Sequence, residues 1–285
     1  MTKATMILEG GATRGLFSAG ALDYLMEQDN YFTDVIGVSM GACNAIDYAS
    51  KQIGRTKDCI IHNDKETNYY YKPIEMIRKK SLMDMDLIFD TFPKEIYPFD
   101  FETYSKSEMH CELVVTNCIT GKAQYISEKK DFDRLMQVTR ASCSMPIVSK
   151  MTDLDGMPYL DGGLADSIPI KRAMKFGNKK IFIILTRNDG YRKEPNTKAL
   201  AKVYKKMYKD YPALVNTLLA RNNHYNKTIE KIEEYERKGY IFVIRPEIPT
   251  ISRVEKDVDK MQEFYQHGYE MMDEKYQALT EYLEK

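Results

Sequence analysis

The feature that most constrains this chain is the stretch VIGVSMGACNA at residues 35–45. It begins as a short apolar strand, turns through small residues that carry one serine, and continues as the first turn of a helix. Ser39 lies at the turn, between Gly37 and Gly41 and next to Met40. Because glycines lack a Cβ atom, a strand and a helix can approach closely there while the serine hydroxyl is forced outward. The pattern indicates a displayed nucleophile, and an ordinary strand-to-helix turn capped by serine is the alternative.

Short apolar runs alternate with helical patterns in the order that is typical of a parallel sheet. The candidate strands are residues 5–8, 35–38, 111–117 with 123–126 as a hairpin partner, 158–160, 180–186 and 240–244. The candidate helices are residues 16–28, 40–53, 132–141 and 168–176, with long charged helical patterns after residues 186 and 252. The runs at 180–186 and 240–244 are continuously apolar, as expected where helices cover both sheet faces. We therefore predict an α/β fold, a layered and mostly parallel central sheet flanked by helices.

The composition fits one domain over residues 1–285 that acts in the cytoplasm. With 43% hydrophobic residues in 285, the chain can bury a sizeable core. The 42 basic and 42 acidic residues cancel, so no nucleic-acid footprint is visible. No apolar run approaches the roughly 18 residues of a membrane span. Five scattered cysteines without a C-x-x-C pair argue against a disulfide framework and fit a reducing compartment.

A loop of small residues, EGGATRG at residues 9–15, follows the first predicted strand directly. Such a loop lets backbone N–H groups converge at the start of the next helix, and Arg14 adds a fixed positive charge. Leu16 and Phe17 stand where a P-loop needs Lys and Ser or Thr, and Ala12 replaces the second glycine of a dinucleotide fingerprint. The loop therefore indicates an anion-binding site, with a loop that merely turns the chain as the alternative. Its members are Gly10, Gly11, Ala12, Thr13, Arg14 and Gly15.

An aspartate followed by two glycines, Asp161-Gly162-Gly163, ends the short extended segment at residues 158–160. A carboxylate at the end of a strand can project over the edge of the sheet. The alternative is a turn aspartate that hydrogen-bonds its own backbone, and for this motif taken alone the alternative is favoured.

Taken together and in this order, the three motifs closely resemble those of the patatin-like phospholipase family, in particular its bacterial cytoplasmic-type members. The similarity extends to GVSMGACNA at residues 37–45, ASCSMP at 141–146 and DGGLADSIP at 161–169. It covers most of residues 4–190, and the IRP at 244–246 is also similar.

The resemblance implies a catalytic dyad in which Ser39 is the nucleophile and Asp161 is the base. It implies that the loop at residues 10–15 supplies oxyanion donors, with Arg14 ordering or charging that site. The implied reaction is hydrolysis of carboxylic esters of lipids, such as phospholipids or lysophospholipids, through an acyl-serine and without a metal or other cofactor. Ala12 departs from the family's usual glycine, and a positive φ there would strain it. An acyltransferase and a non-catalytic lipid-binding protein remain as alternatives.

A serine–histidine–acid triad is disfavoured by where the histidines fall. An α/β-hydrolase needs a histidine after its acid, but His62 and His110 precede Asp161. His224 and His267 lie in charged helical stretches that are expected to be solvated. Cys43, one helical turn after the serine, is interpreted as a small packing residue.

Two further segments carry expectations about lipid contact. Residues 64–108 are mixed in composition, and their apolar part at 81–101 either caps an acyl site or packs on the sheet, the second being favoured. Residues 252–285 are expected to form a helical extension packed on the domain. Peripheral contact with a membrane is a further expectation.

Overall fold

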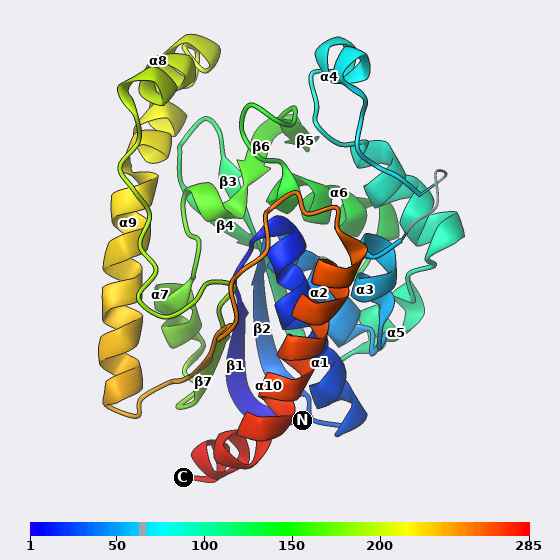
Figure 1. Cartoon of the computed structure of the whole chain (residues 1–285), viewed down its shortest axis with the longest axis vertical. Coiled ribbons are helices and arrows are strands. Elements are labelled where there is room, and N and C mark those ends of the chain that lie inside the picture. Colours follow the sequence, from blue (N-terminus) through cyan, green and yellow to red (C-terminus); the bar gives the residue numbers. More distant parts are fainter. Residues whose placement is uncertain (63–66) are drawn as a thin grey trace.

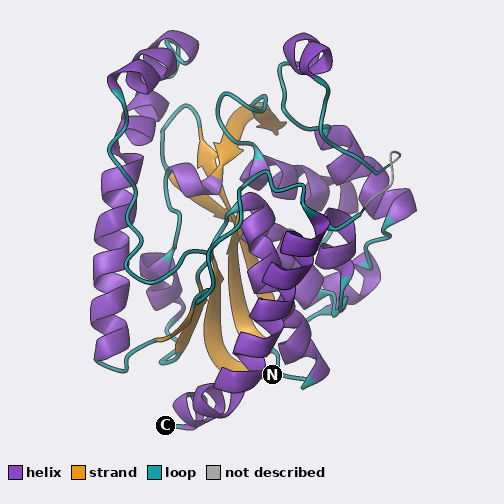
Figure 2. Cartoon of the chain, viewed as in Figure 1, coloured by secondary structure: helices purple, strands orange, loops and turns teal. Residues whose placement is uncertain are grey.

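The computed structural model describes residues 1–62 and 67–285, which form an eight-stranded sheet with helices on both faces (Figures 1 and 2). The strands are β1 Thr2–Leu8, β2 Phe32–Val38, β3 His110–Asn117, β4 Ala123–Ile126, β5 Thr152–Leu154, β6 Met157–Asp161, β7 Ile181–Ile184 and β8 Phe242–Ile244. The α-helices are α1 Gly15–Glu27, α2 Met40–Ala49, α3 Arg55–Ile60, α4 Pro73–Lys79, α5 Phe101–Lys106, α6 Phe132–Cys143, α7 Ile170–Ala173, α8 Lys198–Met207, α9 Pro212–Arg237 and α10 Val258–Glu284. Short 3₁₀ turns cover Ala12–Arg14, Gly162–Leu164 and Met174–Phe176, and a π-helix covers Leu87–Ile96.

The strand order is β5-β6-β3-β2-β1-β7-β8, with β4 paired to β3. The strands β3, β2, β1, β7 and β8 run parallel, whereas β4, β5 and β6 add antiparallel pairings at one end. The predicted α/β class with a mostly parallel sheet is confirmed. Carboxyl ends of parallel strands meet at one edge of a sheet, and β1 and β2 deliver the glycine-rich loop and Ser39 to that edge.

Alternating side chains of the central strands build two separate cores. Met6, Val35 and Leu113 face a core shared with α1, α2, α6 and α10. Ile7, Ile36 and Val114 face the opposite core, to which α9 contributes Tyr225, Ile229 and Ile232. All four residues of β7 are buried, which explains why that run reads as continuously apolar.

Helix α10 lies directly on α1, and two glycines make the close approach possible (Figure 1). A Cβ added to Gly20 would lie 2.1 Å from the Tyr265 carbonyl oxygen, and one added to Gly268 would lie 2.0 Å from the Phe17 carbonyl oxygen. The Tyr265 hydroxyl donates a 2.6 Å hydrogen bond to the buried carboxylate of Asp23. Because α1 begins at the end of the glycine-rich loop, α10 holds that loop indirectly.

The π-helix in the predicted cap segment packs against α6, whereas Phe99 of the same segment joins the core that the sheet shares with α1 and α2. Residues 64–66 of that segment lie outside the described residues. The π-helix Leu87–Ile96 buries Phe89 and Phe92 and encloses Pro93. Its end is closed by a 2.7 Å hydrogen bond from the Tyr97 N–H to the Phe92 carbonyl.

The second predicted helix ends earlier than residue 53. Helix α2 stops at Ala49, and Lys51 and Gly54 then adopt φ values of 59° and 79°. Left-handed backbone interrupts an α-helix.

In the described ranges, no helix has both the length and the apolar character of a membrane-crossing segment.

Candidate active site

Ser39 lies at a strained turn between β2 and α2. Its φ of 55° and ψ of −125° are unusual for a residue other than glycine. A Cβ on Gly37 would lie 2.3 Å from the Gly41 carbonyl oxygen, and one on Gly41 would lie 2.3 Å from the Leu8 carbonyl oxygen. Both glycines are therefore required by the turn. The Ser39 side chain makes no capping hydrogen bond to α2, so it does not serve as an ordinary helix cap.

A second serine, Ser142, fixes the turn from behind. The Ser39 N–H donates a 2.9 Å hydrogen bond to Ser142 Oγ, which donates a 2.6 Å hydrogen bond to the Val114 carbonyl on β3. Ser142 is fully buried near the end of α6. The sequence reasoning missed this role, although Ser142 lies inside the small-residue segment 141–146.

Strand β3 brings Asp161 to the end of β2. At Val114 the strand is paired with Val38 on one edge and with β4 on the other. At Val115 it is still paired with β4, but the other edge is now occupied by Asp161 of β6. Strands β2 and β6 therefore share one edge of β3 and meet end to end. This places Asp161 beside Ser39 although 121 intervening residues separate them in the sequence.

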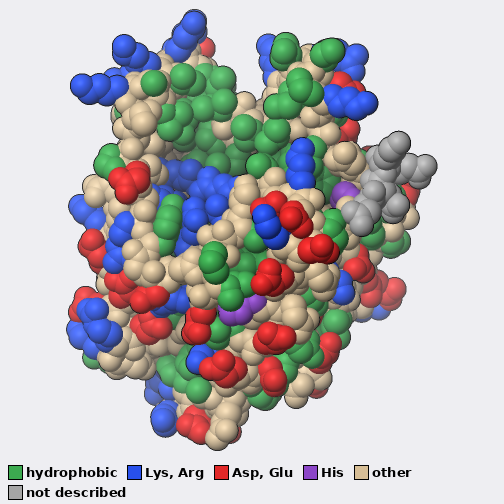
Figure 3. All heavy atoms as spheres, in the orientation of Figure 1, with side chains coloured by type: hydrophobic (Ala, Val, Ile, Leu, Met, Phe, Trp, Pro, Cys, Tyr) green, Lys and Arg blue, Asp and Glu red, His purple; other side chains and the backbone are tan. Residues whose placement is uncertain are grey.

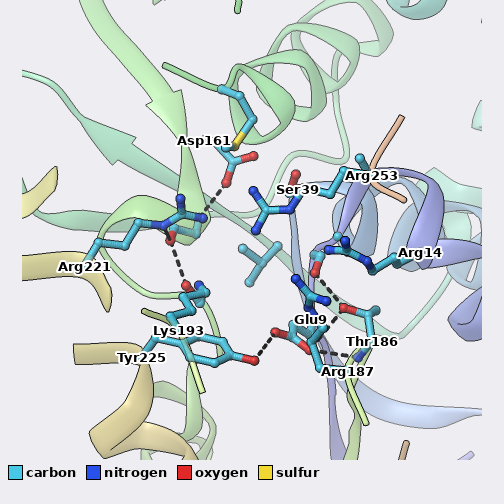
Figure 4. A pocket seen from close by; sticks show the side chains of 17 residues that line it. Glu9, Arg14, Ser39, Asp161, Thr186, Arg187, Lys193, Arg221, Tyr225 and Arg253 are labelled. Carbon is cyan, nitrogen blue, oxygen red and sulfur yellow. Dashed lines mark hydrogen bonds between the residues drawn. The ribbon is translucent and has the colours of Figure 1, made fainter. Parts of the chain in front are cut away.

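One oxygen of the Asp161 carboxylate is occupied and the other is free. Oδ1 accepts a 2.7 Å hydrogen bond from the Gly163 N–H, which is the turn interaction expected from the alternative interpretation of this motif. Oδ2 is buried without a hydrogen-bond partner in the described part of the chain. Burial raises the pKa of Asp161, and this is partly offset by the Ser39 hydroxyl and by the positive charge of Arg221. The pair thus combines a poorly solvated carboxylate with a nearby hydroxyl (Figure 4).

Asp161 is held by close backbone packing and by Arg221. A Cβ on Gly162 would lie 2.1 Å from the Val114 carbonyl oxygen, so only glycine fits there. Arg221 Nε on α9 donates a 2.8 Å hydrogen bond to the Gly163 carbonyl. The Asp161 N–H donates to the Ser144 carbonyl at 2.8 Å. These contacts fix both ends of the turn that carries the carboxylate.

The glycine-rich loop packs against the serine turn. A Cβ on Gly10 would lie 2.6 Å from Ser39 Cβ, and one on Gly15 would lie 2.3 Å from Met40 Cγ. Within the described residues, the N–H groups of Gly10, Gly11 and Ala12 donate no hydrogen bond. The loop that packs against the serine turn therefore carries backbone donors without an acceptor in the described chain.

Ala12 has a φ of 52°, in the left-handed region that favours glycine. A positive φ at Ala12 was the condition for the backbone strain that the sequence analysis predicted there. The next residue, Thr13, donates through Oγ1 to the Ser252 carbonyl at 2.6 Å. The strained position is thus held by a contact with the chain segment that precedes α10.

Arg14 points back into the protein and orders the loop. It is buried, and its Nε donates a 2.8 Å hydrogen bond to the Ile251 carbonyl. Burial, together with the positive charges of Arg187 and Arg253, lowers the pKa of Arg14 to about 10. Arg14 therefore joins the loop to the segment at residues 251–253 and adds positive charge to the cavity beside it.

Two cavities of opposite character meet at Ser39, Ala12 and Met145. The first, which we call the apolar pocket, has a volume of about 960 Å³ including its open mouth. Its lining comes from α2, α3, α6, residues 69–70 and the segment at residues 83–93, and it includes Ile46, Met85, Ile88, Phe89, Phe92 and Met136. The predicted cap segment thus forms one wall of this pocket.

The second cavity, which we call the cationic pocket, has a volume of about 550 Å³ including its mouth. It is defined by the basic side chains of Arg14, Arg187, Lys193, Arg221 and Arg253 (Figure 4). Figure 3 shows basic side chains gathered on the floor of the hollow beside α9. Sequence reasoning found only the first of these residues, because the others come from separate segments without a shared motif.

Cysteine side chains, but no histidine side chains, lie next to Ser39 in the described chain, and Cys143 interacts with the Ser39 hydroxyl. No histidine of the described chain lines either pocket. Cys43 and Cys143 line the apolar pocket with their sulfur atoms 3.8 Å apart. No group of three or more His, Cys, Asp or Glu side chains in the described ranges is arranged to hold a metal ion.

Comparison with known proteins places this geometry in a family. A family model described as patatin-like phospholipase matches residues 6–174, which is more than half of the chain and includes Ser39 and Asp161. The chain belongs to the patatin-like phospholipase family. The resemblance read from the sequence is confirmed, and membership supports a lipid acyl hydrolase activity. A second model, described as a domain of unknown function (DUF6363), matches residues 211–284.

Two individual proteins are also similar. The uncharacterized protein YjjU of Escherichia coli (strain K12) is 27% identical over 197 residues, which are 65% of this chain and 52% of that protein. The chain thus spans about half the length of this curated relative. The crystal structure of VipD from Legionella pneumophila superposes with a TM-score of 0.49 at 13% identity, covering 96% of this chain and 66% of that one.

The strain at Ala12 gives a prediction about stability. Ala12→Gly is expected to increase the free energy of unfolding by several tenths of a kcal/mol. Relief of the left-handed strain is worth about 1–2 kcal/mol, and the added entropy of the unfolded chain offsets about 0.4–1 kcal/mol of it. The control is Ala278→Gly at an exposed position of α10, which should lower stability by about 1 kcal/mol. Urea unfolding measures both, and equal destabilisation by the two variants would contradict the strain.

Proposed function

We propose that this protein is a serine acyl hydrolase that cleaves carboxylic ester bonds of lipids through a Ser39–Asp161 dyad. The observation that carries the proposal is the end-to-end meeting of β2 and β6 on β3, which sets a strained serine beside a buried carboxylate with one free oxygen. Strained backbone conformations occur most often at active sites and ligand-binding sites. The absence of any histidine from the two pockets in the described chain favours a dyad over a triad.

In the first half-reaction, Ser39 Oγ attacks the ester carbonyl carbon while Asp161 Oδ2 accepts the hydroxyl proton. The negative charge that develops on the carbonyl oxygen is stabilised by the free N–H groups of Gly10, Gly11 and Ala12. The tetrahedral intermediate collapses, the alcohol leaves with the proton from Asp161, and an acyl-serine remains. Water then attacks the acyl carbonyl, with Asp161 accepting its proton and returning it to Ser39 Oγ as the fatty acid leaves.

Burial makes Asp161 a stronger base than an ordinary aspartate. A solvated carboxylate with a pKa of about 3.9 is a weak base toward a serine hydroxyl. Because burial raises the pKa of Asp161, its affinity for the serine proton is increased. The Ser39 hydroxyl and the positive charge of Arg221 limit this rise of the Asp161 pKa.

The apolar pocket is proposed to hold the acyl chain. It opens at Ser39 and is walled by aliphatic, aromatic and methionine side chains. Methionine and aliphatic side chains suit a flexible hydrocarbon because they bury it without polar cost. An acyltransferase would use the same acyl-serine with an alcohol in place of water, and product analysis with alcohol acceptors separates it from a hydrolase.

Two protruding helices are proposed as the surface that meets a membrane. Helices α4 and α8 stand on either side of the hollow above the site (Figures 1 and 3). Helix α4 buries none of its side chains, and Ile74 and Ile77 are 82% and 80% exposed. Helix α8 exposes Val203 and Met207 and carries Lys198, Lys202, Lys205 and Lys206. Apolar tips with nearby lysines fit an anionic lipid surface.

The first prediction concerns the nucleophile and its base. A fluorophosphonate probe should label the wild-type protein once, at Ser39, as read by intact mass and peptide mapping. Ser39→Ala should abolish labelling, and Asp161→Asn should slow it by at least about 100-fold because general-base catalysis is lost. Ser105→Ala on the surface helix α5 serves as the control and should label like wild type.

The pH dependence of the same labelling reaction tests the base. Labelling requires ionised Asp161, so its rate should fall as the pH drops through the raised pKa, with a midpoint above the ordinary value of 3.8. A labelling rate at Ser39 that is independent of Asp161 and of pH in the acidic range would refute the dyad.

The second prediction concerns acyl-chain length. Ile88→Trp should fill part of the apolar pocket and reduce kcat/KM for hexadecanoyl esters by about tenfold or more relative to butyryl esters. Each methylene kept out of the pocket forfeits about 0.8 kcal/mol. Ile96→Trp, at the exposed end of the same π-helix, is the matched control. Equal chain-length profiles for both variants would place the acyl chain elsewhere.

The third prediction concerns membrane contact. Co-sedimentation with phosphatidylglycerol-containing vesicles should be weakened by Ile74→Glu and Ile77→Glu, and more strongly by the double variant. Each change removes an apolar contact worth about 1.5–3 kcal/mol when fully buried. Ile53→Glu removes an isoleucine that is 50% exposed between α2 and α3 and should leave vesicle binding unchanged. Undiminished binding by the double variant would show that α4 does not contact the bilayer.

A further inference from the structure

The cationic pocket holds an excess of positive charge that the protein itself does not neutralise. Among the described residues, none of its five basic side chains forms an ion pair with a carboxylate. Elsewhere in the protein, partly buried arginines such as Arg55, Arg172 and Arg245 each pair with an acidic residue. Unpaired charge that is even partly buried is costly, so this cluster requires an explanation.

The two carboxylates that line the pocket do not balance it. Glu9 accepts hydrogen bonds from the Thr186 N–H at 2.8 Å, from Thr186 Oγ1 at 3.1 Å and from the Tyr225 hydroxyl at 2.9 Å, and within the described chain it forms no ion pair with the basic side chains of the pocket. Asp161 is the proposed base and is bound to Gly163. With both carboxylates ionised, two negative charges face five basic side chains.

Mutual repulsion among the cations is visible in their pKa values. Burial and the charges of Arg221 and Arg253 lower the pKa of Lys193 well below its ordinary value. Burial lowers the pKa of Arg221, and the charge of Arg253 contributes. An anion bound between these groups would relieve the repulsion, because it favours the charged form of each.

Four of the five cations come from beyond the part of the chain that the patatin model matches, residues 6–174. Arg187 and Lys193 follow β7, whereas Arg221 and Arg253 lie within residues 211–284, the region matched by the domain of unknown function. Figure 4 shows Arg221 and Arg253 reaching from different elements toward the space beside Asp161 and Ser39.

The cations are positioned by hydrogen bonds that do not use up their charge. Arg221 donates to the Gly163 carbonyl, and Arg187 donates to the Tyr191 and Thr250 hydroxyls at 3.2 Å and 3.4 Å. The segment that carries Arg253 is tied to the glycine-rich loop through Thr13. Neutral partners orient these side chains and leave their positive charge for a ligand.

We propose that the cationic pocket binds a phosphate group on the alcohol portion of the substrate, and that the region of residues 187–253 thereby selects acyl esters of phosphorylated alcohols. This inference rests on the proposed function, since it assigns the leaving-group side of the same site. The acyl chain lies in the apolar pocket, the ester carbonyl lies at Ser39 where the two pockets meet, and the alcohol lies among the arginines. Guanidinium groups bind phosphate through paired N–H donors.

The charge balance favours a terminal phosphomonoester over a phosphocholine diester. A phosphomonoester carries about −1.5 to −2 charges at pH 7 and offers three acceptor oxygens. A phosphocholine group brings one negative charge and a quaternary ammonium, which the surplus arginines would repel. The preferred substrate class is therefore an acylated alcohol with a free terminal phosphate.

The test compares two lysolipids with the same acyl chain, 1-acylglycerol 3-phosphate and 1-acylglycerol phosphocholine, together with a neutral 4-nitrophenyl ester. Wild type should hydrolyse the phosphate lysolipid with a kcat/KM about tenfold or more above that for the phosphocholine lysolipid, as expected for one or more charge-assisted hydrogen bonds. The preference should shrink as NaCl is added, because salt screens the attraction. Equal kcat/KM for both lysolipids would overturn the proposal.

The variants locate the preference. Arg253→Gln should reduce the ratio of the two kcat/KM values by about tenfold, and Arg253→Lys, which keeps the charge, should retain much of it. Arg237→Gln, at an exposed position of α9 outside the pocket, is the matched control and should leave the ratio unchanged. If Arg253→Gln left the ratio of the two kcat/KM values as unchanged as Arg237→Gln does, the assignment would be contradicted.

A binding measurement on Ser39→Ala separates this inference from the proposed function. Calorimetric titration with glycerol 3-phosphate and with inorganic phosphate needs no turnover and should show binding that Arg253→Gln weakens. If no ester is hydrolysed but glycerol 3-phosphate binds in this way, the anion pocket stands and the hydrolase proposal fails. If esters are hydrolysed without preference while inorganic phosphate binds, the pocket is a free-phosphate site and the substrate assignment fails.

Discussion

The rest of the site depends on one edge of β3, along which the pairing with β2 ends at Val38. Because β2 ends there, the next backbone groups of β3 would be unpaired, and antiparallel β6 forms hydrogen bonds with them. The two strands that share this edge deliver Ser39 and Asp161 from opposite sides. Strand pairing therefore fixes where the carboxylate lies relative to the hydroxyl.

The close approach at this junction accounts for several residues at once. Gly37, Gly41 and Gly162 each sit where a Cβ would collide with a backbone atom. Ser142 then ties the Ser39 N–H to β3, so the serine turn and the strand beneath it form one hydrogen-bonded unit. The strain at Ser39 is sustained because the surrounding backbone leaves no alternative conformation.

The parts of the site that the sequence could predict are those encoded over a few neighbouring residues. The serine turn and the glycine-rich loop have local steric requirements, so their residue types identify them. Asp161 was recognisable only with the other two motifs, because its placement depends on long-range pairing with β3. Arg221 and Arg253 carry no local signal, since one lies on a long charged helix and the other in a loop. Their convergence follows from tertiary packing, because α9 covers one face of the sheet and the segment before α10 is tied to the glycine-rich loop.

The position of β1 has a consequence for biosynthesis. This buried strand is completed on one side by β2 soon after it is made, but on the other side only by β7, which begins at Ile181. At translation rates of about 5–20 residues per second, the edge that β7 covers stays open for roughly 10–35 seconds. An apolar strand edge exposed for that time is prone to pair with another chain. The nascent chain is therefore expected to be more prone to aggregation than the finished sheet, in which both edges of β1 are paired.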